Sequence, residues 1–191
     1  ILCPKDGHNH FPRWREFREF GGGGLADMGA HHFDIAQWAL GMDHSGPVEI
    51  DPPKGDAVRG LMFKYASGVK MFHGGARNLT FEGTGGKIEV DRVGMETTPA
   101  SIAAEPLGLQ DAHLENPGDS LKKNWLACIR TRQPPIADVE IGARSAAVCH
   151  LANIGYQLRR PLKWNPATEE FAGDAEANKL LDRPGRGPWN L

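Results

Sequence analysis

The sequence predicts an α+β fold: an open, mainly antiparallel β-sheet with helices on one face. Short runs with a period of two fill residues 47–92, and apolar residues recur with helical spacing before and after them. Strand and helix patterns do not alternate along the chain as they do in βαβ units. We therefore expect segregated strands and helices and no parallel sheet.

A chain of 191 residues and 20.8 kDa fits one compact unit. Hydrophobic residues make up 40% of the chain, which excludes extensive disorder, and 24 glycines with 14 prolines predict many turns. We divide the chain into a lead-in loop over residues 1–20 and a domain over residues 21–191.

Charge and cysteine usage exclude several classes of protein. The 22 Lys and Arg and the 24 Asp and Glu are interspersed, unlike the surface of a nucleic-acid-binding protein. No apolar run approaches the ~20 residues of a membrane span and no leader pattern opens the sequence, so we expect a soluble protein, cytoplasmic or periplasmic. Three cysteines without a CxxC pair argue against a disulfide framework and a cysteine-rich zinc site. Cys128 and Cys149 are expected to be reduced core residues of helices.

Three helices are predicted by their spacing and their ends. Residues 25–40 contain no proline and are followed by a glycine, which predicts one continuous helix. The cap Ser120 predicts a second helix that ends before Pro134, and Asp138 caps a third that ends near residue 159.

Strands are predicted where β-branched and aromatic residues cluster between turn signals. These runs are residues 47–50, 57–65, 68–74, 78–83 and 86–92, which together predict an antiparallel meander. Residues 93–118 carry no strong signal. Residues 162–191 are rich in proline and charge, and we expect an extended tail that wraps the surface or a neighbouring subunit.

The first helix is expected to have one buried and one polar face. At ~100° per residue, one arc of the helix collects its apolar side chains. These are Leu25, Met28, Gly29, Phe33, Ile35, Ala36, Ala39 and Leu40. The opposite side gathers Asp27, His31, Asp34 and Trp38 into a single stripe.

The polar stripe suits proton transfer. His31 lies four residues after Asp27 and three before Asp34, so either carboxylate can accept a hydrogen bond from one ring nitrogen and fix the tautomer. The other nitrogen then faces a substrate hydroxyl. The alternative is a solvated helix face with an incidental ion pair. His32 falls within the apolar arc and is expected to be a hydrogen-bonded core residue.

Two other kinds of site are weaker interpretations of the same segment. A metal site on Asp27, His31 and Asp34 lacks a second histidine on the stripe, so we expect no metal. The glycine run 21–24 favours a tight turn over a phosphate cradle, because no strand precedes it and GxGxxG is absent. His73 at the end of a predicted strand is given no role.

The same segment resembles a known family. WREF, GGGGLADMGAHHFDIAQWALGMD and GPVEI resemble the signature of the C-terminal domain of the Gfo/Idh/MocA oxidoreductases, the glucose-fructose oxidoreductase and inositol dehydrogenase family. FEGTGGKIEVDR, NWLACIRTRQPPIADVEIGARSAAVCHLANIGYQL and EANKLLDRPGRGPWNL resemble later parts of that domain. The resemblance covers about residues 12–191.

This resemblance implies a sheet that forms homo-oligomer contacts and a first helix that borders the active site. His31 matches the family's proton-transfer histidine, and Asp27 matches the aspartate that supports it. The NAD- or NADP-binding Rossmann domain of the family, with its catalytic lysine, has no counterpart in these residues, and Lys5 is no substitute. We expect a fragment, or one half of a split enzyme, that is inactive without that domain.

Three functions are carried forward. The first is the substrate-binding and oligomerisation domain of an NAD(P)-dependent oxidoreductase acting on a sugar, cyclitol or related polyol. In it, substrate is bound by Trp14, which stacks on a sugar face, by Arg15, and by Asp34 and Trp38 beside His31. The second is an NAD-dependent glycosidase on the same scaffold. The third is a non-catalytic module for sugar binding or self-association.

Overall fold

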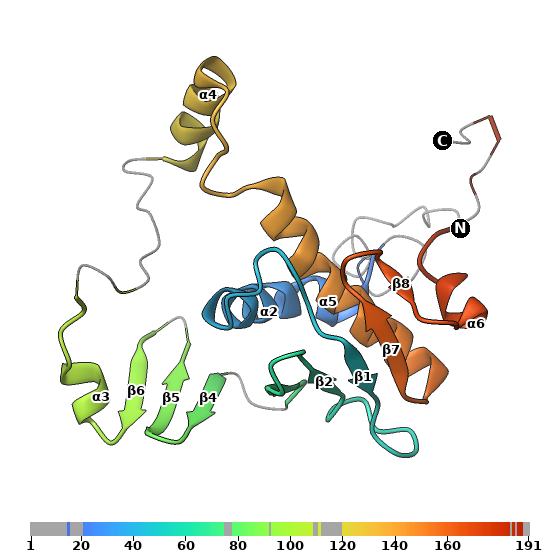
Figure 1. Cartoon of the computed structure of the whole chain (residues 1–191), viewed down its shortest axis with the longest axis horizontal. Helices are drawn as coiled ribbons and strands as arrows, with labels where there is room; N and C mark the ends of the chain where they lie inside the picture. Colours follow the sequence, from blue (N-terminus) through green and yellow to red (C-terminus); the bar gives the residue numbers. More distant parts are fainter. Residues whose placement is uncertain are drawn as a thin grey trace, which may run out of the picture. The chain divides into compact units, whose positions relative to one another are not determined.

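The computed structural model describes residues 15, 21–74, 78–91, 93–108, 111, 120–183, 185 and 187–188. Contacts divide the chain into two compact units (Figure 1). The first unit comprises residues 1–75 and 140–191, and the second comprises residues 76–139. The predicted class is confirmed, because helices accompany open antiparallel sheets.

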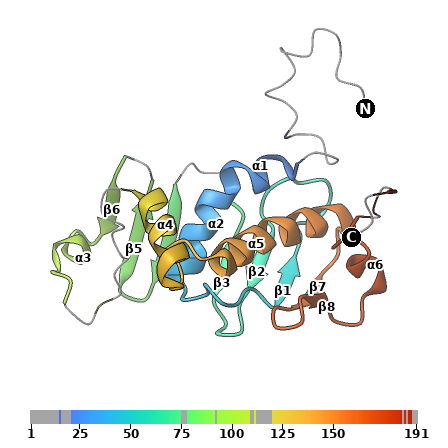
Figure 2. The same cartoon turned by 90° about the horizontal axis from the view of Figure 1, so that it is seen from above.

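The first unit is built on a five-stranded sheet with the order β3-β2-β1-β7-β8. Its strands are β1 (Glu49–Asp51), β2 (Met62–Lys64), β3 (Lys70–Phe72), β7 (Leu162–Asn165) and β8 (Glu170–Phe171). Every pair is antiparallel. Helices α2 (Met28–Ala39) and α5 (Val139–Leu158) lie on one side of this sheet (Figures 1 and 2).

The core lies between the sheet and α5. Ile50 stands opposite both Phe63 and Leu162 in the strand register, and all three side chains are buried. Gly155 lets α5 approach closely, because a Cβ atom there would lie 2.8 Å from Leu61 and 2.9 Å from Ile50. At this position the side chains of Leu61 and Ile50 therefore pack directly against the backbone of α5.

Gln37 is a buried polar side chain that joins α2 to the sheet. Its amide nitrogen donates to the carbonyls of Met42 at 3.2 Å and Ser45 at 3.1 Å, and its oxygen accepts from the Tyr65 hydroxyl at 2.6 Å. Burial raises the pKa of Tyr65, so the phenol keeps the proton that it donates. The Gln37 side chain thus donates two hydrogen bonds and accepts one, as expected for a buried polar group.

The first predicted helix is wrong as a continuous element. The chain forms α1 (Gly23–Ala26) and α2, separated at Asp27, whose φ of −99° and ψ of −96° leave the helical region. The residues at the start of the predicted helix are rich in glycine, which has a low helix propensity, and Gly23 itself has a φ of +66°.

The predicted buried face of this segment is correct only in part. Phe33 and Ala36 are buried as expected, but Met28 and Ile35 are 49% and 40% exposed, and Ala39 is exposed. The buried Gln37 was assigned to no face. The inward row instead follows Ala30, Phe33, Ala36, Gln37 and Leu40. The buried side of α2 is thus turned away from the predicted arc toward Gln37.

The expected extended tail is also wrong. Residues 162–165 form β7, which pairs with β1, and residues 170–178 add β8 and the short helix α6 (Ala175–Asn178). Leu162 and Trp164 are buried and alternate with exposed side chains, a strand pattern that spans only four residues. Arg159, with a φ of +55°, ends α5 ahead of this strand.

The second unit contains a three-stranded antiparallel sheet of the order β4-β5-β6. Its strands are β4 (Leu79–Gly83), β5 (Gly86–Val90) and β6 (Met95–Thr98), followed by α3 (Ser101–Ala104) and α4 (Leu121–Thr131). The strands predicted over residues 47–92 thus form two sheets, and residues 93–118, where no element was expected, contain β6 and α3.

This smaller sheet has two chemically different faces. The strand register places Leu79, Phe81, Ile88, Val90 and Met95 on one face, and threonine, glutamate and lysine side chains on the other. Among the described residues between 78 and 138, none is buried. Four of these five apolar side chains are half-buried and Met95 is 54% exposed, so the described part of the unit covers this face only in part.

The second and third predicted helices are confirmed. The Ser120 hydroxyl accepts from the Lys122 backbone N–H at 3.2 Å and caps α4, which ends before Pro134, and α5 begins directly after Asp138. Cys149 is buried in α5 and Cys128 is partly exposed, and neither forms a disulfide. Over the described residues, no helix is long and apolar enough to cross a membrane.

Candidate functional site

The candidate site lies on α2 and the turn before it. His31, Asp34 and Trp38 all belong to α2 and are all exposed, with Trp38 at 37%. These three side chains keep the relation expected from helical spacing. Asp27 does not, because it stands at the break between α1 and α2 rather than on the helix. Trp14 lies outside the described residues.

Arg15, rather than His31, is the partner of Asp27. The Arg15 Nε atom lies 3.0 Å from Asp27 Oδ2, and both side chains are nearly half exposed. Such exposed pairs contribute little to stability. Two residues predicted separately, one as a substrate-binding cation and one as the support of His31, are therefore brought together by the structure.

Asp34 is held from the opposite helix. The Ser145 hydroxyl on α5 donates to Asp34 Oδ1 at 2.8 Å, and Ser145 itself is only 6% exposed. In the sequence, Ser145 keeps helical spacing with the apolar residues Ile141, Val148 and Ala152, and that pattern gives it no partner. A hydroxyl within an apolar row is the signal that could have pointed to a buried hydrogen bond.

The turn before the site is held by the same helix. The Asn153 side-chain amide donates to the Gly22 carbonyl at 2.8 Å. A Cβ atom on Gly22 would lie 2.4 Å from Ala26 Cβ and 3.6 Å from His150 Cε1, so this position has room only for glycine. Together with the positive φ of Gly23, this geometry fits the tight turn expected from the glycine run.

The His31 ring is exposed to solvent. Among the described residues, the structure records no hydrogen bond between this ring and Asp27 or Asp34. The neighbouring His32 is half-buried and has an interaction of its own. Of the two adjacent histidines, His31 is thus the more exposed.

Another histidine, His73, forms a contact between the sheet and α5. His73 Nδ1 lies 2.7 Å from the Tyr156 hydroxyl, which also accepts from the Leu61 backbone N–H at 3.2 Å. His73 and Tyr156 therefore share one hydrogen bond, and the tautomer of the ring sets which of them donates. Burial, and secondarily the charge of Arg59, lower the pKa of His73. This contact is structural and lies apart from the exposed His31 ring.

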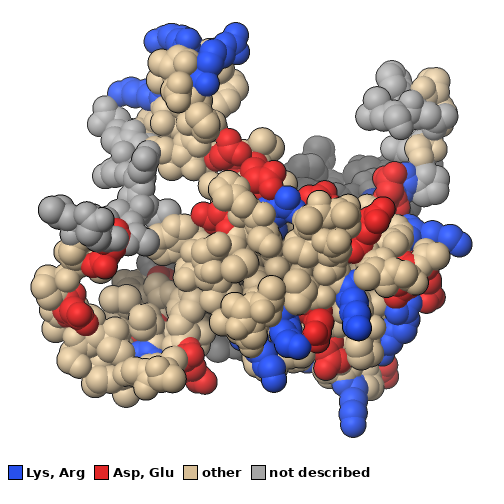
Figure 3. Space-filling view, in the orientation of Figure 1, with Lys and Arg blue, Asp and Glu red and all other residues tan. Residues whose placement is uncertain are grey.

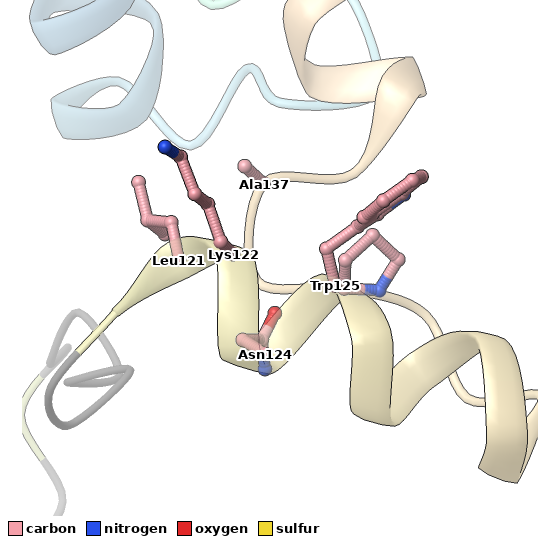
Figure 4. Close-up of a pocket in the computed structure, with 6 residues that line it drawn as sticks. Leu121, Lys122, Asn124, Trp125 and Ala137 are labelled. Atoms are coloured by element: carbon pink, nitrogen blue, oxygen red, sulfur yellow. The ribbon is translucent and has the colours of Figure 1, made fainter.

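Beside α4 lies a shallow apolar hollow of about 240 Å³. Leu121, Lys122, Asn124, Trp125 and Ala137 surround it (Figure 4). Basic side chains gather at α4 in Figure 3, and the sequence has no acidic residue between 120 and 137. None of the predicted site residues lines this hollow.

The described residues do not fit a dinucleotide or metal site. Every strand pair that the structure records is antiparallel, so these residues contain no strand–turn–helix unit of the Rossmann type. Nor do they contain a group of three or more His, Cys, Asp or Glu side chains suited to a metal ion.

The described residues form an α+β fold with open antiparallel sheets, and an exposed histidine lies on the helix that follows a glycine-rich turn. The family described as the C-terminal alpha/beta domain of the Gfo/Idh/MocA oxidoreductases matches residues 3–191. The chain belongs to this family, as the resemblance indicated. The comparisons with curated proteins and with solved structures found no match.

Proposed function

We propose that this chain is the substrate-binding part of an NAD(P)-dependent oxidoreductase that acts on a sugar, cyclitol or related polyol. Membership of an oxidoreductase family supports the reaction class. The observation that carries the site is the exposed His31 on α2, flanked by two carboxylates that are each held by another side chain. The cofactor is bound by a separate Rossmann domain, since the described residues provide no site for it.

His31 removes the proton of the substrate hydroxyl in this proposal. A neutral imidazole at the surface of α2 accepts that proton, and a carboxylate within one helical turn stabilises the imidazolium that forms. Asp34 is the nearer candidate for this role because it shares α2 with His31. Asp27 acts with Arg15, and the pair offers a hydrogen-bonding surface to substrate hydroxyls at the start of the helix. Trp38, exposed on the same helix, lies beside the bound substrate in this proposal.

The sheets supply the oligomer contacts. On the outer face of the five-stranded sheet, Phe72 is 61% exposed and stands opposite Met62 in the register. The adjoining row is charged and includes the Glu49–Lys64 ion pair at 2.9 Å. An isolated chain leaves Phe72 and the apolar face of β4-β5-β6 in water, which favours their burial against a second copy.

The test is His31→Ala in the enzyme completed by its cofactor-binding domain. We expect kcat to fall by ~10²–10⁴, the loss typical of a missing general base, with little change in cofactor affinity. His44→Ala, which removes another exposed histidine beyond the end of α2, is the matched control and should leave kcat unchanged. Normal turnover of His31→Ala would contradict the proposal. Sugar release without net cofactor reduction would instead indicate the glycosidase.

A further inference from the structure

α5 fixes the candidate site segment at two points. Ser145 contacts Asp34 on α2, and Asn153 contacts Gly22 before α1. The two α5 residues are eight positions apart, so they lie a little over two turns apart along the helix and about 80° apart around it. His31 falls between the two attachment points in the sequence. The position of its helix relative to the core is thus set by hydrogen bonds from α5.

The buried donor Ser145 makes the attachment at Asp34 well defined. Ser145 is 6% exposed, and the side chain one turn later, Cys149, is 1% exposed. A serine side chain has a single rotatable bond before its oxygen, so a buried Ser145 presents its hydroxyl from a nearly fixed point. The aspartate that accepts this hydrogen bond is thereby held in one orientation.

The contact leaves one carboxylate oxygen of Asp34 available. Oδ1 accepts from Ser145, and among the described residues Oδ2 has no hydrogen-bond partner. Asp34 lies three residues after His31, within the distance at which helical side chains meet. An anchored carboxylate with one free oxygen can stabilise a charged imidazole without first losing its own side-chain freedom.

We propose that Ser145 is a positioning residue, which holds Asp34 so that its free oxygen serves His31 during proton transfer. This inference rests on the proposed function and adds a residue to its site. Ser145 itself touches neither the substrate nor the reacting atoms. Its contribution passes entirely through Asp34, and this dependence can be measured.

The first experiment compares Ser145→Ala with Val148→Ala in the complete enzyme. Val148 is buried at 1% on the same helix, so its truncation tests loss of packing alone. Ser145→Ala should lower kcat about 10-fold with KM nearly unchanged, since the lost hydrogen bond has a charged partner. Ser145→Thr, which keeps the hydroxyl, should recover kcat, whereas Val148→Ala should lower only the melting temperature. Equal effects of Ser145→Ala and Val148→Ala on kcat would overturn the inference.

A double-mutant cycle with Asp34→Asn decides whether the effect passes through Asp34. If it does, adding Ser145→Ala to Asp34→Asn lowers kcat no further. If the effects of the two changes on kcat were fully additive and His31→Ala were still inactive, the positioning role of Ser145 would be overturned and the proposed function would stand. Normal turnover of His31→Ala would instead overturn the proposed function, so the two failures are distinguishable.

Discussion

The two compact units differ in how their apolar side chains are covered. In the first unit, Phe63 and Ile50 on the sheet are fully buried, Ile50 against α5 and Phe63 against Phe33 of α2. In the second, the apolar row on β4, β5 and β6 is only half-buried, and Leu121 and Trp125 on α4 are 56% and 58% exposed. Regular strand alternation is present in both units. Alternation thus produces a sheet, but a core forms only where another element covers one face.

The largest expected contrast is between two phenylalanines on equivalent strand positions. Phe63→Ala in the first unit should lower the free energy of unfolding by about 3–5 kcal/mol, because it leaves a cavity in a closed core. Phe81→Ala in the second unit should cost about 1 kcal/mol or less, because Phe81 already contacts solvent. Urea denaturation of each variant measures the difference. Equal losses would show that the second sheet is covered in solution.

A second contrast uses two glycines of α5. Gly155→Ala should destabilise by about 1–3 kcal/mol, because the added methyl group overlaps Leu61 and Ile50. Gly142→Ala meets nothing within 4 Å and should stabilise the helix by up to ~1 kcal/mol. Thermal melts of the two variants measure both effects. A shift of the same sign in both would mean that α5 does not approach the sheet closely.

The smallest expected effect is the pH dependence contributed by His73. Its pKa in the folded chain lies below 6.5, so below that pH the unfolded chain binds the proton more readily. The stability that His73 contributes is complete above pH 6.5 and is lost as the pH falls through that value toward the lowered pKa. His73→Gln should flatten this part of the profile of melting temperature against pH. An unchanged slope between the two proteins would refute the assignment.

The sequence predicted correctly those helices whose ends are set by neighbouring residues, such as a cap or a proline. The Ser120 cap and the proline pair after α4 are adjacent to the ends that they define, so α4 was located correctly from the sequence. Helix α5 begins after Asp138 and was found for the same reason. Both predictions needed no knowledge of tertiary contacts.

Elements that depend on distant partners were not predicted. Strand β7 is four residues long, and its register partner Ile50 precedes Leu162 by more than a hundred residues. The break at Asp27 accompanies an ion pair with Arg15, which helical spacing does not encode. Helical spacing did bring His31, Asp34 and Trp38 to one helix, but the partner that holds Asp34 was invisible without the packing of α5.

The pairing of β1 with β7 also bears on the order of folding during synthesis. Glu49 pairs with Lys163, so the five-stranded sheet joins segments from opposite ends of the chain. The hairpins β4-β5 and β5-β6 join neighbours in the sequence and involve short loop closures. A nascent chain can form these hairpins early, whereas β1 must await the emergence of β7 from the ribosome. Until then β1 has one unpaired edge, and an unpaired strand edge is prone to mispairing.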